Sequence, residues 1–151
     1  MTIDLLGDKA LQLRHVVLDF NGTLAFEGVV AESTVERLSE LSRLFEVTIA
    51  TADTFGTARA FASRVGVALE IVRQGRDKER LVRRLEGGVV AIGNGVNDVA
   101  MFSAADLAIA VMGGEGVAVR AGAAADILAP SIDWALELLL HPKRLVATLR
   151  E

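Results

Sequence analysis

Three polar residues stand where a short apolar run of the sequence ends. Asp19 follows the run His15–Leu18, Thr51 closes a β-branched run, and Asn94 comes just after the run Val89–Ile92. Ligands of parallel sheets bind at the carboxyl ends of the strands, so a site is expected where these residues meet. A carboxylate there could attack a phosphoryl group if cations offset the repulsion between the two anions.

The segment Val16–Leu24 contains an apolar run followed by the pattern Asp-x-Asn-x-Thr. It resembles the first motif of the haloacid dehalogenase-like (HAD) superfamily, which usually reads Asp-x-Asp-x-Thr. Thr51 resembles the second motif of that family, Lys78 the third and Gly93–Asp98 the fourth. One such motif would be a weak signal, but four of them in the family's order are specific.

A closer resemblance is to the phosphorylation domain of P-type ATPases, and it covers nearly the whole chain. The segments that carry it are Thr51–Asp53, Asp77-Lys78, Gly93–Asp98, Met101, Ala105-Asp106, Ala108–Ala110 and Ala124–Leu128. The resemblance implies an α/β fold with three layers, in which helices cover both faces of a Rossmann-like, doubly wound, mainly parallel sheet. It also implies a hydrolase, either a phosphatase or an ATPase-like phosphotransferase.

The same resemblance implies that Asp19 is the nucleophile and receives the phosphoryl group as an aspartyl phosphate. Asn21, Thr51 and Lys78 complete the catalytic set. The residues that would hold the phosphoryl oxygens are Phe20, Asn21, Thr51, Ala52, Lys78 and Asn97. The expected partner is therefore a phosphorylated substrate, whose identity the motifs do not specify.

Mg²⁺ is the cofactor that the resemblance implies. Its ligands would be the Asp19 carboxylate, the backbone carbonyl of Asn21 and the side chains of Asn94 and Asp98. Mg²⁺ prefers oxygen ligands and keeps several waters, which suits this set. Together with Lys78, the ion would offset the charge of a carboxylate that faces a phosphate dianion.

Two positions depart from the family pattern. Asn21 stands where the phosphatases of the family have the Asp that acts as general acid and base. Since such help is typically worth ~10²–10⁴-fold in rate, we expect slow turnover. P-type ATPases also lack Asp at this place. Asn94 replaces the first Asp of the fourth motif, which predicts weaker binding of the metal.

The elements that must position these residues alternate between strand and helix from about residue 14 onwards, which indicates βαβ units. Strands are predicted at 15–18, 47–51, 68–72, 89–92, 107–111 and 126–129, and helices at 56–65, 77–86 and 116–123, with another that begins at Asn97 or Asp98.

Helix boundaries are predicted from capping signals. Ser33 and Glu36 have the spacing of a capping box, before a helix whose apolar face would extend to Leu44. Ser131 is predicted to cap a final helix, which Pro142 should kink or restart because it lacks a backbone N–H.

The 151 residues fit one domain, which we place at 1–151. The stretches between Asp19 and Thr51, and between Thr51 and Lys78, are too short for the cap domains that the family inserts there. We therefore expect no cap domain, and a site open to solvent unless a homo-oligomer covers it.

The composition of the chain excludes several classes of partner and of chemistry. A net charge of −4 argues against a nucleic acid as the main partner, and the absence of cysteine excludes thiol catalysis and disulfides. The longest uncharged stretch, Gly87–Asn97, is far shorter than the ~18 apolar residues of a membrane span. The N-terminus lacks the pattern of a signal peptide, so we expect a cytoplasmic protein with no membrane partner.

Two other functions fit parts of the pattern. Because Asn21 and Asn94 replace two carboxylates, the chain could be a non-catalytic module that binds phosphate or Mg²⁺, with a regulatory or assembly role. A response-regulator receiver domain also phosphorylates an Asp, but it needs adjacent acids near its start, and Asp4 and Asp8 are not adjacent. Asp53 could face the ligand or serve only its loop, and Asn94 could be a turn residue.

Overall fold

The fold is built on a mainly parallel sheet, seen here in a computed structural model that describes residues 1–4 and 10–150. Its described strands are β1 (Thr2–Asp4), β2 (Ala10–Leu18), β3 (Glu46–Thr51), β4 (Ala68–Ile71), β5 (Gly88–Gly93), β6 (Leu107–Val111) and β7 (Ile127–Ala129). Their order is β4-β3-β2-β5-β6-β7, all parallel, and β1 pairs antiparallel with β2.

Helices connect the strands in nearly every interval. They are α1 (Glu32–Leu41), α2 (Thr57–Val65), α3 (Gly75–Arg84), the 3₁₀ helix η1 (Val96–Asp98), α4 (Val99–Ala104), α5 (Val119–Ala124), α6 (Ile132–Leu140) and α7 (Pro142–Leu149). Among the described residues, no helix is both long and apolar enough to span a membrane.

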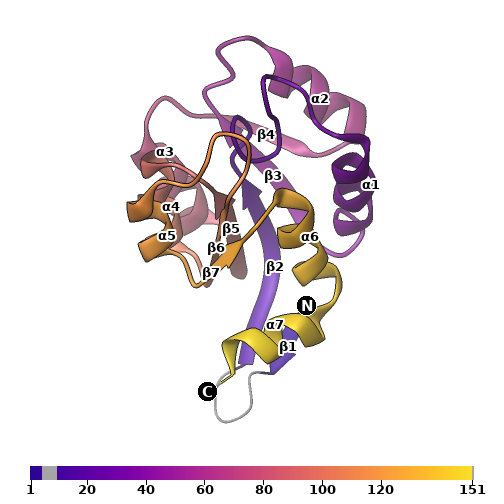
Figure 1. The fold of residues 1–151 in the computed structure, drawn as a ribbon, viewed down its shortest axis with the longest axis vertical. Coiled ribbons are helices and arrows are strands. Elements are labelled where there is room, and N and C mark those ends of the chain that lie inside the picture. Colours follow the sequence, from indigo (N-terminus) through magenta and orange to yellow (C-terminus); the bar gives the residue numbers. More distant parts are fainter. Residues whose placement is uncertain (5–9, 151) are drawn as a thin grey trace.

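Alternation of side chains along the strands separates two hydrophobic clusters. Val16 and Leu18 of β2 pack into the cluster that also holds buried residues of α1, α2, α6 and α7. Val17 packs into the cluster formed with α3, α4 and α5. Figure 1 shows these two groups of helices on opposite sides of the sheet. The predicted three-layer, doubly wound α/β architecture is therefore confirmed.

The chain changes direction across the sheet at β2. It runs from β2 through β3 to β4 on one side, and then returns to β5, β6 and β7 on the other. Sheets of this kind form a crevice at the carboxyl ends of the strands where the order reverses. Asp19 follows β2 and Asn94 follows β5, so both lie at this crevice. The connections after β2 and β3 contain no cap domain, as predicted.

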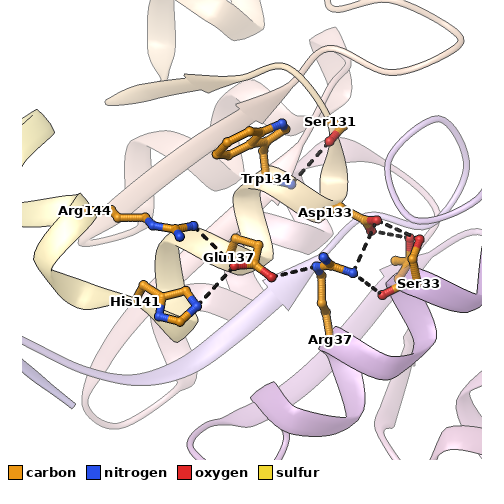
Figure 2. Close-up of polar contacts among 9 residues, drawn as sticks. Ser33, Arg37, Ser131, Asp133, Trp134, Glu137, His141 and Arg144 are labelled. Atoms are coloured by element: carbon orange, nitrogen blue, oxygen red, sulfur yellow. Dashed lines mark hydrogen bonds and ion pairs between the residues drawn. The ribbon is translucent and has the colours of Figure 1, made fainter.

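The capping box predicted at Ser33 is wrong. α1 begins at Glu32, with Ala31 at the N-cap position and no side-chain cap. Ser33 lies in the first turn, where its hydroxyl donates to Asp133 of α6 at 2.7 Å (Figure 2). The helix also ends at Leu41, and Leu44 is 53% exposed instead of continuing the apolar face. A partner on a distant helix therefore outweighed the local capping pattern.

The C-terminal helices begin as the sequence predicts. The Ser131 hydroxyl accepts from the Trp134 backbone N–H at 3.2 Å (Figure 2). Helix α7 begins at Pro142. Strand β1 and the first residues of β2 were not predicted, because an antiparallel edge pairing of this kind has no strong periodic signal. Asp8, considered above for a receiver-type acidic pair, lies outside the described residues.

Candidate active site

A cavity of about 400 Å³ lies at the carboxyl ends of the central strands. Most of the predicted site residues line it, namely Asp19, Asn21, Thr51, Ala52, Lys78, Asn94 and Asn97. Two other predicted site residues, Phe20 and Asp98, do not line this cavity. The fold thus brings together residues from widely separated parts of the sequence.

Asp19 is held firmly at the end of β2. Its backbone N–H donates to the Ile92 carbonyl of β5 at 2.9 Å, and the residue is 6% exposed. The chain then folds into a compact turn, in which Thr23 and Ala25 donate to the Phe20 carbonyl at 3.2 and 2.9 Å. The Phe20 ring packs against Phe61, with centroids 5.7 Å apart, so only its backbone can serve the site.

A buried lysine joins the two acids of the predicted motifs. The Lys78 ammonium donates to Asp19 Oδ1 at 2.9 Å and to Asp98 Oδ1 at 2.7 Å, and its side chain is only 3% exposed. Lys78 comes from the first turns of α3, whose N-terminal Gly75 lies directly against the Asn97 backbone, where an added Cβ would overlap the carbonyl. This close approach lets α3 bring its lysine beneath the cavity.

Asp98 is fully buried and uses both of its oxygens within the protein. Oδ1 accepts from Lys78, and Oδ2 accepts from the backbone N–H groups of Asn94 and Gly95, both at 3.0 Å. An added Cβ at Gly93 would overlap the Asp98 carboxylate, so the glycine that ends β5 makes room for it. The geometry indicates that Asp98 orients Lys78 and the turn after β5. Its predicted role as a Mg²⁺ ligand stays a prediction.

The electrostatics of this group follow from its burial. The pKa of the Asp19 carboxyl is raised to about 6, first by burial and then by the charge of Asp98, although Lys78 and the Phe20 backbone N–H act in the opposite direction. Burial alone would lower the pKa of Lys78, but the two carboxylates outweigh it and raise that pKa. At neutral pH the lysine is therefore a cation beside a largely ionised Asp19.

Thr51 and Asp53 have separate tasks after β3. Thr51 is 3% exposed and lines the cavity, while its Oγ1 accepts from the Asp53 backbone N–H at 3.2 Å. The Asp53 carboxylate instead accepts from the N–H groups of Ala58 and Arg59, at 2.9 and 3.1 Å, in the first turn of α2. Of the two possibilities left open for Asp53, the structure supports the local one, in which the side chain stabilises α2.

Asn94 faces the cavity with its amide fixed on both sides. Its Oδ1 accepts from the Thr23 hydroxyl at 3.3 Å, and its Nδ2 donates to the Gly116 carbonyl at 3.2 Å. The amide therefore ties the turn after β2 to the loop after β6, as a structural residue would. Its oxygen keeps a second lone pair for a ligand.

Several residues that line the cavity were not predicted as site residues. These are Val72, Arg73, Gln74 and Gly75 after β4, Gly95 after β5, and Glu115 in the loop after β6. A signal for them existed, since they also follow the carboxyl ends of predicted strands. Glu115 lies four residues beyond the predicted strand 107–111, and no role was predicted for it.

The chemistry of the cavity suits a hard divalent cation. Its lining offers carboxylate and amide oxygens from Asp19, Asn21, Asn94 and Glu115. In the described part of the chain, no three His, Cys, Asp or Glu side chains gather into a group that could hold a metal ion. Mg²⁺ commonly binds through one or two carboxylates, completed by waters and substrate phosphate, so the residues present fit this ion.

The chain is similar to one archaeal protein in sequence. Over 63 residues it is 44% identical to the uncharacterized protein MJ0073 of Methanocaldococcus jannaschii, and the match covers 42% of this chain and 68% of that protein. No family model matches the chain.

The fold is similar to that of several solved structures. A 3-deoxy-D-manno-octulosonate 8-phosphate phosphatase of Moraxella catarrhalis, in complex with magnesium, phosphate and sugar, has a TM-score of 0.71 at 18% identity, covering 91% of this chain and 94% of that one. The cobalt-bound octulosonate 8-phosphate phosphatase of Haemophilus influenzae has a TM-score of 0.70 at 13% identity, covering 89% and 92%.

A zinc-transporting PIB-type ATPase has a TM-score of 0.65 at 26% identity. That match covers 80% of this chain but only 20% of the transporter, so this chain corresponds to a small part of such a protein. Together these findings confirm the resemblance to haloacid dehalogenase-like proteins and to the phosphorylation domain of P-type ATPases. The chain belongs to the same family as the archaeal protein, and its fold is that of the haloacid dehalogenase-like superfamily.

Proposed function

We propose that this protein is a Mg²⁺-dependent phosphatase or phosphotransferase without a cap domain, and that its nucleophile is the Asp19 carboxylate. The observation that carries the proposal is the buried Lys78 ammonium, which bridges Asp19 and Asp98 at the base of the cavity. Burying one cation between two carboxylates costs free energy of folding. Such costly arrangements of charged groups are typical of catalytic sites.

The first step would transfer a phosphoryl group to Asp19. Asp19 Oδ1 accepts from Lys78, and the other carboxylate oxygen would attack phosphorus while the bond to the leaving oxygen breaks. Lys78, the Thr51 hydroxyl and the Asn97 amide line the cavity where the phosphoryl oxygens would lie. When bound through Asp19, Asn21 and Asn94, Mg²⁺ would offset the negative charge that carboxylate and phosphoryl group bring together.

The second step would release the phosphate. Water would attack the phosphorus of the aspartyl phosphate, which restores the Asp19 carboxylate and yields inorganic phosphate. The attacking water must lose a proton, and the leaving oxygen of the first step must gain one. The Asn21 amide lines the cavity but can do neither. We therefore expect the aspartyl phosphate to accumulate and turnover to be slow.

Intact-mass measurement after incubation with acetyl phosphate and Mg²⁺ tests the nucleophile. The wild-type protein should gain one phosphoryl group, and Asp19→Asn should gain none. Asp53→Asn is the matched control, because this acid follows the neighbouring strand and asparagine can still cap α2. An adduct that persists in Asp19→Asn, or the absence of any adduct in the wild type, would contradict the proposal.

Asn21→Asp tests the second step. Restoring a carboxylate at this position should speed hydrolysis of the phosphoenzyme by ~10²–10⁴-fold, followed as phosphate release. If Asn21→Asp releases phosphate no faster than the wild type, the missing general base is not what limits hydrolysis.

A second candidate is a module that binds phosphate or Mg²⁺ without catalysis. It is favoured by Asn94, whose amide is already used to join two loops. Such a module would bind inorganic phosphate or Mn²⁺ but form no adduct, and Asn21→Asp would not make it a phosphatase.

A further inference from the structure

The buried charges around Asp19 at the base of the cavity do not balance. Lys78 is shared between the carboxylates of Asp19 and Asp98, so the buried group has two negative charges against one positive charge when all three are ionised. A phosphoryl group would add more negative charge beside it. Arg73 is the other basic residue that lines the cavity, but it is exposed, so a divalent cation bound by the residues that face the cavity would offset this charge more strongly.

Glu115 brings one more carboxylate to this cavity. It lies in the loop between β6 and α5, at a tight turn in which the Gly116 N–H donates to the Gly113 carbonyl at 2.9 Å. The loop is tied to the fourth motif, because the Ala118 N–H donates to the Asn94 carbonyl at 2.9 Å and the Asn94 side chain donates to Gly116. The backbone that carries Glu115 is thus fixed relative to Asn94.

Gly22 keeps a space open beside this carboxylate. A Cβ added at Gly22 would overlap the Glu115 Oε2 and the side-chain amide of Asn94, so these two groups meet above the turn that follows Asp19. The φ of Gly22 is +78°, which also favours glycine. The acid from the β6 loop and the amide from the fourth motif therefore share one place, next to Asn21.

The Glu115 carboxylate makes no hydrogen bond or ion pair with any residue in the described part of the chain. Glu115 is exposed, so water can solvate its charge, but its carboxylate would still repel a phosphoryl group bound in the same cavity. The Glu115 carboxylate would favour phosphoryl binding only if a cation were bound between the carboxylate and the phosphoryl group. In that case the negative charge of Glu115 would strengthen binding of the cation.

We propose that Glu115 is a ligand of the divalent cation in this cavity and supplies the charge lost where Asn94 replaces the acid of the fourth motif. The ion would be bound by the carboxylates of Asp19 and Glu115 and by the Asn94 amide oxygen. This inference rests on the proposed function and goes beyond it, because neither the motifs nor the fold assign a role to the loop after β6.

Binding of Mn²⁺ alone, measured by electron paramagnetic resonance of the free ion, tests the inference without any turnover. Glu115→Gln keeps the shape of the side chain and removes its charge. Since even the outer-shell partners of a metal typically cost 10–100-fold in affinity when removed, we expect the Kd for Mn²⁺ to rise at least about tenfold. Glu36→Gln, at an exposed position of α1, is the matched control and should leave the Kd unchanged.

Asn94→Asp sharpens the test. In the Glu115→Gln background, this change should restore most of the lost affinity, because it returns one negative charge to the same place. Binding by Glu115→Gln as tight as that of the wild type would overturn the inference, and so would a wild-type protein that binds no Mn²⁺.

The two proposals can fail separately. If Asp19→Asn abolishes both Mn²⁺ binding and the phosphoryl adduct while Glu115→Gln changes neither, the role of Glu115 is refuted and the proposed function stands. If Glu115→Gln weakens Mn²⁺ binding but no variant forms an adduct, the cation site stands and the proposed nucleophile is refuted.

Discussion

Two clusters in this protein have a basic side chain between two carboxylates, and they differ in their access to water. In the cavity, Lys78 bridges Asp19 and Asp98, and the three side chains are 3%, 9% and 0% exposed. Between α1 and α6, Arg37 interacts with Glu137 at 2.9 Å and Asp133 at 3.7 Å, and the three side chains are 24–30% exposed. Figure 2 shows this second cluster.

The difference shows what each cluster is suited to do. Water near the Arg37 cluster screens the charges, so the ions cost little to place and contribute little to stability. Its residues join α1 to α6, with Ser33 and Thr34 donating to Asp133 at 2.7 and 2.6 Å. The Lys78 cluster is costly to bury, and burial, followed by the charge of Asp98, raises the pKa of Asp19 to about 6. Such perturbed carboxyl groups are frequent in functional sites.

Among the changes that test this comparison, Lys78→Met should cause the largest loss of stability. The change leaves two buried carboxylates without their cation, and breaking a buried pair in this way typically costs about 3–5 kcal/mol of unfolding free energy. It should also abolish the phosphoryl adduct at Asp19. Urea denaturation followed by circular dichroism measures the first effect and intact mass the second. A loss below about 1 kcal/mol would mean that the buried cluster behaves like an exposed one.

The pH dependence of stability should show the next largest effect. Because the folded protein holds the Asp19 proton up to about pH 6, whereas the ordinary pKa is 3.8, it binds more protons than the unfolded chain between these values. Lowering the pH from 7 to 5 should therefore stabilise the metal-free protein through this group, by about 1–2 kcal/mol.

Urea denaturation in the presence of a chelator, at pH 5 and pH 7, measures that difference. Asp19→Asn should lack this component, so the comparison of the two proteins isolates it from other titrating groups. Identical pH dependence in the wild type and Asp19→Asn would show that Asp19 titrates normally.

Arg37→Met should have the smallest effect. Its ion pairs are partly exposed, and we expect a loss of about 1 kcal/mol or less. The loss should shrink further at high salt, since mobile ions screen exposed charges. The same denaturation measurement at low and at high salt tests both points. A loss that equals that of Lys78→Met would remove the distinction between the two clusters.

Much of the fold could be predicted because its signals are local. Short apolar runs gave the strands β3 to β7, and Ser131 and Pro142 marked the beginnings of α6 and α7. Ser33 shows where such signals fail. Its local pattern favours a cap, but its hydroxyl binds a carboxylate 100 residues away, and no local pattern contains that partner.

The sequence by itself determined the strand-end residues of the site, because the order of motifs from Asp19 to Gly93–Asp98 follows the order of the strands. Only the tertiary structure decided what several side chains do there. It turned Asp53 toward α2, buried Asp98 beneath Lys78 and brought Glu115 to the cavity. These roles depend on which groups packing removes from water and which it leaves unpaired, and both follow from contacts between segments far apart in the chain.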